Sequence, residues 1–211
     1  MQSLLSGLRS LDETVSLSSE GIVSLIEQHL RFKQANSRGG SRLQVIIVAA
    51  AYNAASNKLG VRVLPLASHN AADKQTGALG DVEIMLINED KIITSFEMKM
   101  KRVTIDDIDG ALHKVIASPH SIDNYIFITT EPVEIAVQEY ARSLYDSTDG
   151  IEFVVLDCID FLRHFLHLFH RLRAQFLNAY QELLLAAPER AVTQPIKEAF
   201  LAMRQAAESS E

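Results

Sequence analysis

The chain has 211 residues, of which 47% are hydrophobic and 22% are charged, and its formal net charge at pH 7 is −7. This length and apolar content are sufficient to bury a substantial core, so we expect one principal domain with an appended segment. The acidic net charge argues against broad, non-specific binding to nucleic acid, because such binding depends on Lys and Arg that neutralise phosphates.

Signals for a membrane or for export are not evident in the sequence. No apolar run reaches the roughly 18 residues that cross a bilayer, and no basic-then-apolar leader opens the chain. The single cysteine, Cys158, excludes an intramolecular disulfide and a multi-cysteine metal site, and its apolar neighbours predict a buried thiol. We therefore expect a soluble, cytoplasmic protein without a membrane partner.

The first part of the chain is predicted to be helical. An apolar stripe at helical spacing extends over residues 20–33, and the Gly-rich segment 36–40 ends it. Ser41 and Gln44 then fit a capping box, in which the two side chains satisfy free backbone donors of a new helix. This helix, residues 41–57, is apolar nearly all round, so we expect it to be central and covered on most sides.

Strands alternate with helices in the middle of the chain, which predicts a mixed sheet covered by helices on both faces. The predicted order is a strand at 61–64, a hairpin at 80–99, a helix that Thr104 and Asp107 cap, a buried strand at 125–129, a helix at 133–145 and a strand at 151–156. The remainder is predicted to form one long helix to about residue 185 and a second helix from about residue 193.

The hairpin at residues 80–99 carries the charged residues of greatest interest. Asp81 lies at the start of its first strand, and Glu97 and Lys99 lie near the end of its second. Side chains alternate between the two faces of a strand, so Glu97 and Lys99 share one face. The other face carries Ile92, Thr94, Phe96, Met98 and Met100. Antiparallel pairing through the turn at residues 88–91 would bring Asp81 close to Glu97.

An Asp on one strand and Glu-X-Lys on the next, followed by a helix and a strand, resembles the PD-(D/E)XK nuclease superfamily, which includes many type II restriction endonucleases. The matching residues are Asp81, Glu97 and Lys99, and the family's order of core helix, strand, hairpin, helix and strand fits residues 41–130. Within the superfamily the chain looks most like a restriction enzyme, with the SacI family as the candidate. Gly80 stands where a proline often precedes the Asp.

The resemblance implies an α/β fold with a restriction-endonuclease-like mixed central sheet flanked by helices. We expect this core at residues 41–157, an N-terminal helical arm at 1–40, and a C-terminal helical segment at 158–211 that packs on the core or on a partner. The aromatic-rich apolar stripe of the C-terminal segment is typical of a helix that completes the core or forms a dimer seam. A homodimer would suit a restriction enzyme, because palindromic DNA sites mirror two-fold proteins.

The chemistry of these residue types fits a divalent cation. Mg²⁺ prefers oxygen ligands and is commonly held by one or two carboxylates and substrate phosphate. We expect Asp81 and Glu97 to be those carboxylates, with Mn²⁺ as a substitute metal, and the resemblance adds the backbone carbonyl of Met98. Lys99 would orient the attacking water or stabilise charge on the phosphate oxygens.

Other candidate residues have weaker patterns. Many members of the superfamily place a Glu on the first core helix, but residues 41–57 contain no acid. Glu27 on the preceding helix and Glu83 on the Asp81 face are the candidates for an additional acid. Candidates for contacts with DNA phosphates are Arg38, Arg42, Lys101 and Arg102. An ordinary capped turn and a solvated strand end are the alternatives for these basic residues.

Two functions remain open at this point. The first is a metal-dependent endodeoxyribonuclease that hydrolyses DNA phosphodiester bonds with Asp81, Glu97 and Lys99. The second is a catalytically inactive nuclease-fold protein that serves as a binding or assembly module, with the charged residues forming a plain surface salt bridge. The acidic net charge and the missing helix acid favour the second.

The histidines at 164, 167 and 170 are spaced three residues apart, unlike the i, i+4 pair of helix-borne zinc sites, so we expect them to line the edge of an apolar stripe and not to bind a metal.

Overall fold

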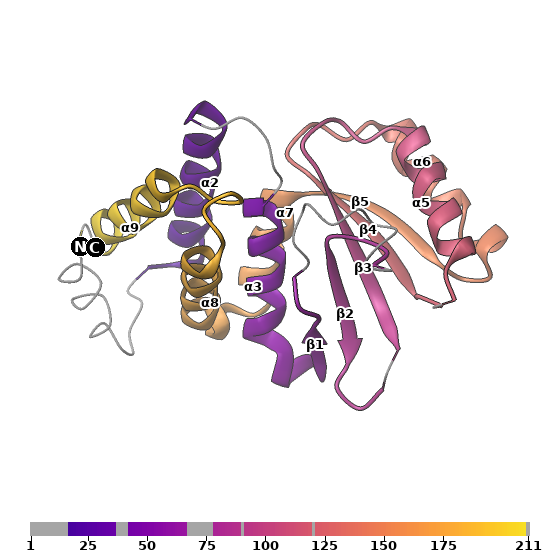
Figure 1. Cartoon of the computed structure of the whole chain (residues 1–211), viewed down its shortest axis with the longest axis horizontal. Helices are drawn as coiled ribbons and strands as arrows, with labels where there is room; N and C mark the ends of the chain where they lie inside the picture. The colour runs from indigo at the N-terminus through magenta and orange to yellow at the C-terminus, as the bar shows by residue number, and fades with distance from the viewer. Residues whose placement is uncertain (1–16, 37–41, 67–77, 90, 120, 210–211) are drawn as a thin grey trace.

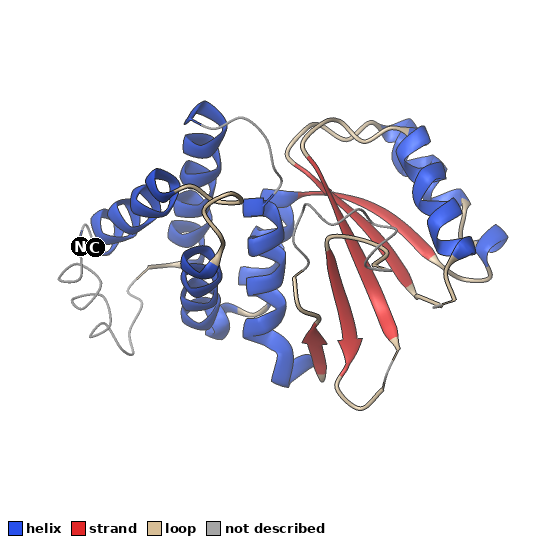
Figure 2. Ribbon diagram, viewed as in Figure 1, coloured by secondary structure: helices blue, strands red, loops and turns tan. Residues whose placement is uncertain are grey.

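The computed structural model describes residues 17–36, 42–66, 78–89, 91–119 and 121–209. Over these residues the chain is an α/β protein in which helices flank both faces of a five-stranded mixed sheet (Figure 2). The predicted order of helices and strands is confirmed over the described residues as far as residue 157. None of the helices in these ranges is long and apolar enough to span a membrane.

The strands lie in the sheet in the order in which they occur along the chain. They are β1 (Val61–Val63), β2 (Val82–Leu86), β3 (Ile92–Lys99), β4 (Asn124–Thr129) and β5 (Glu152–Asp157). β1, β2 and β3 pair antiparallel, whereas β3, β4 and β5 pair parallel. β3 is therefore the central strand, and its carboxyl end lies at the same edge of the sheet as those of β4 and β5.

Helices form two layers against the sheet (Figure 1). They are α2 (Ser19–Asn36), α3 (Arg42–Leu59), α5 (Ile105–Ala117), α6 (Ile135–Ser143), α7 (Cys158–Leu168), α8 (Arg173–Ala186) and α9 (Gln194–Ser209), with short 3-10 turns η1 (Asp146–Thr148) and η2 (His170–Leu172). α3 and α7 cover one face of the sheet, with α2, α8 and α9 packed behind them. α5 and α6 cover the other face. The expected central position of α3 is confirmed, because every residue at 43–51 is buried.

Two hydrophobic clusters hold these layers together. The first joins the sheet to α3 and includes residues of α2, α7, α8 and α9, so both ends of the described chain contribute to one core. It contains Cys158, which is fully buried as predicted, and burial raises the pKa of its thiol. The second cluster joins the opposite face of the sheet to α5 and α6.

The side chains of β3 divide between these two clusters. Phe96 and Met98 pack in the first cluster, and the ring of Phe96 lies 5.5 Å from that of Tyr52 on α3. The pairing register with β2 shifts between Ile84 and Met85, which leaves an extra residue in β3. Because of this bulge, Ile92 packs in the second cluster. The prediction that Ile92 shares a face with Phe96 is therefore wrong, although the alternation holds towards the end of the strand.

The prediction of one long helix from residue 158 to about 185 is also wrong. Phe169 leaves helical geometry, with φ −116° and ψ 44°, and α8 begins after the η2 turn. The bend brings the rings of Phe165 and Phe176 to 6.1 Å. In a straight helix, residues eleven positions apart would be about 16 Å apart. The bend thus lets both aromatic residues enter one core and lets α8 pack along α3.

A buried histidine links three helices of the outer layer. His29 of α2 places Nδ1 at 2.9 Å from the hydroxyl of Tyr180 on α8, and Nε2 at 2.9 Å from the backbone carbonyl of Ile196 on α9. A carbonyl can only accept, so Nε2 carries the proton and Nδ1 accepts from Tyr180. Burial lowers the pKa of His29 to about 4, against the opposing effect of the bond to Ile196.

This pKa predicts an acid-sensitive stability. The unfolded chain protonates His29 near pH 6.5 and the folded chain near pH 4, so this contribution is present above pH 6.5 and is lost as the pH falls towards 4. The free energy of unfolding should fall by about 3 kcal/mol over this window. Denaturant unfolding measures this effect. The free energy of unfolding of His29→Gln should lack this fall between pH 6.5 and 4, whereas that of His113→Gln, at an exposed site on α5, should show it. Equal acid sensitivity of wild type and His29→Gln would contradict the prediction.

Candidate active site

Asp81 lies immediately before β2 and is held against the end of β3. Its backbone N–H donates to the carbonyl of Phe96 at 2.7 Å, and its Oδ2 accepts from the backbone N–H of Met98 at 2.7 Å. These two bonds contact the residues on either side of Glu97. The structure therefore places Asp81 beside Glu97 on the neighbouring strand, as the hairpin pattern predicts.

The backbone of Met98 faces this same position. In an extended strand, the N–H and C=O of one residue point to the same side. Because the N–H of Met98 donates to Asp81, we expect its carbonyl to point beyond the end of β2 as well. The Met98 side chain packs in the first hydrophobic cluster and is 6% exposed, which fixes the backbone at this point.

Glu97 is contacted by three groups from three different elements. Its Oε1 lies 2.7 Å from Nζ of Lys99, and its Oε2 lies 3.3 Å from Nζ of Lys114 on α5. The hydroxyl of Tyr125 on β4 donates to Oε2. Burial alone would raise the pKa of Glu97, but the hydrogen bonds from Lys99 and Tyr125 and the charge of Lys114 outweigh burial and lower the pKa. Glu97 is therefore a carboxylate at neutral pH.

Lys99 lies between two carboxylates. Its Nζ is 2.7 Å from Glu97 and 2.8 Å from Oδ1 of Asp107, which follows the start of α5. Partial burial would lower the pKa of Lys99, but the bonds to Asp107 and Glu97 raise it. Asp107 is held in turn by the predicted capping box, which is confirmed: its Oδ2 accepts from the backbone N–H of Thr104 at 3.0 Å. The cap thus fixes one partner of the lysine.

Sequence reasoning missed Lys114 and Tyr125 as members of this cluster, and it identified Asp107 only as a capping residue. Asp107 and Lys114 are seven positions apart, so they lie on one face of a helix, and this spacing could have indicated that both face the sheet. No local pattern in the sequence indicated that Tyr125 contacts Glu97. Its position beside Glu97 depends on the parallel register of β3 and β4, which pairs Ser95 with Tyr125.

The two candidates for an additional acid have other contacts. Oε1 of Glu83 accepts from the backbone N–H of Leu79 at 2.8 Å, so Glu83 holds the segment that leads to Asp81. Glu27 forms an ion pair of 2.5 Å with Arg31 on α2. It also lines a cavity of about 380 Å³ with Thr130 and other residues beyond the end of β4.

The basic residues predicted to contact DNA phosphates differ in burial and in their contacts. Arg42 begins α3, where burial lowers its pKa and the charge of the nearby Asp81 opposes this shift. Lys101 is exposed, and Arg102 forms an exposed ion pair of 2.7 Å with Glu134. Arg38 lies outside the described residues, as does Ser41 of the capping box predicted for α3.

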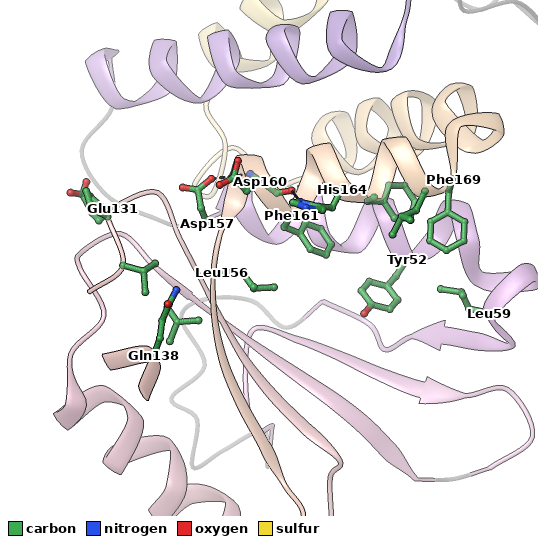
Figure 3. A pocket seen from close by; sticks show the side chains of 15 residues that line it. Tyr52, Leu59, Glu131, Gln138, Leu156, Asp157, Asp160, Phe161, His164 and Phe169 are labelled. Atoms are coloured by element: carbon green, nitrogen blue, oxygen red, sulfur yellow. Dashed lines mark hydrogen bonds between the residues drawn. The ribbon is translucent and has the colours of Figure 1, made fainter. Parts of the chain in front are cut away.

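A cavity of about 760 Å³ lies elsewhere, beside the outer strand β5 and between α6 and α7 (Figure 3). The acids Glu131, Asp157 and Asp160 lie towards one end of it, and Tyr52 and Phe169 lie towards the other. None of the residues in the cluster around Glu97 lines this cavity. Its carboxylates would repel a phosphodiester, so we do not identify it with a nucleic-acid cleft.

The three histidines of the C-terminal segment do not form a metal site. Nδ1 of His164 lies 2.8 Å from the backbone carbonyl of Asp160, and Nε2 of His167 lies 2.8 Å from Glu20. More generally, no group of three or more His, Cys, Asp or Glu side chains within the described ranges is placed to hold a metal ion.

The donors at the end of β3 nevertheless fit a hard cation that keeps part of its water shell. Asp81 and Glu97 supply carboxylate oxygens, and the expected direction of the Met98 carbonyl adds a third oxygen. Mg²⁺ is commonly held by one or two carboxylates while substrate and water complete its octahedron. Two lysine ammonium groups lie against Glu97, so a bound cation would share this carboxylate with them or displace them.

The fold and this cluster define an α/β protein with paired carboxylates and a lysine at the carboxyl end of a central strand. The sequence matches the SacI restriction endonuclease C-terminal domain family over residues 15–131, which is more than half of the chain, and the chain therefore belongs to this family. The match extends from α2 through β4 and includes every residue of the cluster. Membership suggests nuclease activity with DNA as the substrate. The family is defined by the C-terminal domain of a restriction endonuclease. No curated protein matches the chain.

The position before Asp81 tolerates only glycine without a shift of the backbone. A Cβ added at Gly80 would collide with the carbonyl oxygen of Phe96 and would lie 2.6 Å from Oγ of Ser95. That carbonyl is the acceptor for the N–H of Asp81, so a larger residue would push Asp81 away from β3.

We expect Gly80→Ala to lower the free energy of unfolding by about 1–3 kcal/mol, because the colliding atom belongs to the central strand. Gly110→Ala is the matched control, since a Cβ there would meet nothing within 4 Å on helix α5. The control should gain up to about 1 kcal/mol from helix propensity. Denaturant unfolding of both variants measures the difference, and equal stabilities would refute the steric argument.

Proposed function

We propose that the protein is a Mg²⁺-dependent endodeoxyribonuclease of the PD-(D/E)XK type, with a restriction-endonuclease-like fold, that hydrolyses DNA phosphodiester bonds. The proposal is carried by two hydrogen bonds: the backbone N–H of Asp81 donates to the carbonyl of Phe96, and the Asp81 carboxylate accepts from the N–H of Met98. These bonds set the carboxylate beside Glu97, and Lys99 lies on the same face as Glu97. Membership in a restriction-endonuclease family supports the proposal.

In this proposal, Asp81, Glu97 and the carbonyl of Met98 hold the metal, for which Mn²⁺ can substitute. The bound cation would neutralise developing charge and make a water acidic enough to attack the phosphorus. Lys99 stays protonated at neutral pH, because its contacts with Glu97 and Asp107 raise its pKa. It therefore acts as a hydrogen-bond donor that orients the water or stabilises a phosphate oxygen, and not as a general base.

DNA would approach along the carboxyl end of β3. Arg42 lies near Asp81, and Lys101 and Arg102 come soon after β3. These positions support a role for the three side chains in contacts with phosphates beside the scissile bond. Arg102 would have to leave its exposed ion pair with Glu134, which costs less than about 1 kcal/mol. Arg38 is included in the proposal on its sequence position alone.

A DNA substrate and the single cysteine are consistent with a cytoplasmic location. We also propose a homodimer, because two copies can act on the two strands of a palindromic site. β5 is one of the two outer strands of the sheet, and Ile135 and Leu168 on the flanking helices are 72% and 75% exposed. Exposed apolar residues on both sides of an outer strand favour contact with another copy.

The dimer can be tested by sedimentation velocity. We expect Leu168→Glu to shift the wild-type dimer to a monomer, because it introduces a charge into the proposed contact. Ile116→Glu is the matched control, since Ile116 is 70% exposed but lies on α5. A wild-type chain that sediments as a monomer at every concentration would contradict the proposal.

A catalytically inactive binding module is the second candidate, and one observation favours it. Gln44 of α3 is 1% exposed, and neither polar atom of its amide has a hydrogen-bond partner among the described residues. Helix α3 therefore contributes a buried amide and no acid. A binding module of this kind would bind DNA or a partner without metal uptake at Asp81 and without cleavage.

Lys99 distinguishes the two functions. We expect wild-type protein to cleave plasmid DNA with Mg²⁺ or Mn²⁺ and to stop on addition of a chelator. Lys99→Ala should lower the cleavage rate by roughly 100- to 1,000-fold, because it removes the donor to the developing charge. Lys91→Ala is the control, since Lys91 pairs with Asp123 at the opposite end of the hairpin, and its rate should match that of the wild type.

Robust cleavage by Lys99→Ala would rule out the proposed role of this residue. Absence of cleavage by wild-type protein on any DNA, with no metal binding, would favour the inactive module.

A further inference from the structure

We propose that Tyr125 is a positioning residue, which sets the metal affinity of the site by holding Glu97 and the Asp81 segment in a fixed relation. The inference rests on the proposed function and adds a residue outside the Asp and Glu-X-Lys pattern. It is carried by a single buried hydroxyl that contacts both arms of the site.

The ring of Tyr125 is fixed by packing. Tyr125 is 0% exposed and lies on β4, where it pairs with Ser95 of β3. Its ring stacks on Phe153 at 5.8 Å between centroids and lies 5.3 Å from Phe127. A ring packed against Phe153 of β5 and Phe127 of its own strand leaves its hydroxyl little freedom, so a group bonded to that hydroxyl has a defined position.

The hydroxyl reaches two acceptors. It contacts Oε2 of Glu97, and it lies 3.0 Å from the backbone carbonyl of Leu79, two residues before Asp81. A phenol has one proton to donate, and either acceptor can take it. The hydroxyl therefore keeps a partner if Glu97 turns towards a cation, and it stays in contact with the segment that carries Asp81.

Leu79 is held from its other side as well. Its backbone N–H donates to Oε1 of Glu83 at 2.8 Å. Glu83, Leu79, Tyr125 and Glu97 thus form one continuous chain of contacts from β2 through the Asp81 segment and β4 to β3. These contacts link the segment that carries Asp81 to the strand that carries Glu97, and the carboxylates of these two residues must converge on one ion.

Lys114 also contacts Glu97, but its side chain is 38% exposed. A long exposed side chain restrains its partner weakly because it has many rotamers. Lys99 contacts Glu97 at 2.7 Å, but its side chain is 25% exposed and is shared with Asp107. Tyr125 is the fully buried contact of Glu97, so we assign it the main part in orienting the carboxylate. Removal of a group that orients a metal ligand typically lowers metal affinity about 10- to 100-fold.

The test is a calorimetric titration of the full chain with Mn²⁺. Tyr125→Phe keeps the ring and removes the hydroxyl, and we expect its affinity for Mn²⁺ to fall about 10-fold. Tyr140→Phe is the matched control, because the Tyr140 hydroxyl also donates to a carboxylate, that of Asp109, away from the site. Its affinity should equal that of the wild type. Thermal unfolding checks that each variant is folded.

Asp81→Asn separates failure of the inference from failure of the proposed function. If wild-type protein does not bind Mn²⁺, or if Asp81→Asn binds it equally, the proposed function fails and the inference fails with it. If Asp81→Asn loses binding while Tyr125→Phe binds as the wild type does, the positioning role is overturned and the proposed function stands. Equal losses in Tyr125→Phe and Tyr140→Phe would also overturn the positioning role.

A spectroscopic measurement keeps the inference testable if Tyr125→Phe does not fold. Mn²⁺ binding at Glu97 should change the hydrogen bond of the buried phenol and produce a tyrosine difference absorption. We expect the signal in the wild type and in Tyr140→Phe. Metal binding without any tyrosine difference signal in the wild type would overturn the inference.

Discussion

The alternation of side chains along β3 is the constraint on which the rest of the structure depends. Phe96 and Met98 enter the core beneath α3, and their packing fixes the pleat of the strand. Glu97 and Lys99 alternate with them and must therefore project to the opposite face, towards α5. A strand buried on one face thus gives the charged residues on the other face a rigid base, although these residues contribute little to the core.

Partial burial of the charged cluster is balanced by contacts between opposite charges. Glu97 accepts from two ammonium groups and a phenol, and Lys99 lies between two carboxylates. Charges taken partly out of water need such partners, because an unpaired one would be costly. Helix α5 supplies both Asp107 and Lys114, so the helix that covers this face of the sheet also completes the cluster. Its capping box fixes the first turn from which Asp107 projects.

Local patterns in the sequence predicted most of the fold and the hairpin correctly. The capping box at Thr104 and Asp107 and the unbroken apolar run of β4 are local signals, and both are confirmed. Two predictions failed where a local pattern continued through a change of geometry. The apolar stripe of the C-terminal segment runs past Phe169, where the helix bends, and the alternation in β3 is interrupted by a bulge near Ile92. In both places long-range packing decided the backbone.

The sequence by itself determined that Asp81, at the entry to β2, lies beside the end of β3 that carries Glu97 and Lys99, because a short turn and the period of two leave few other arrangements. Only the tertiary structure decided what surrounds them. Tyr125 reaches Glu97 through the register of a parallel pair, and this register depends on how the connection through α5 packs on the face of the sheet and not on any adjacent residues. Lys114 reaches Glu97 through the same packing. The pattern of the site is therefore local, whereas its environment is set by crossover connections and core packing that no short stretch of sequence encodes.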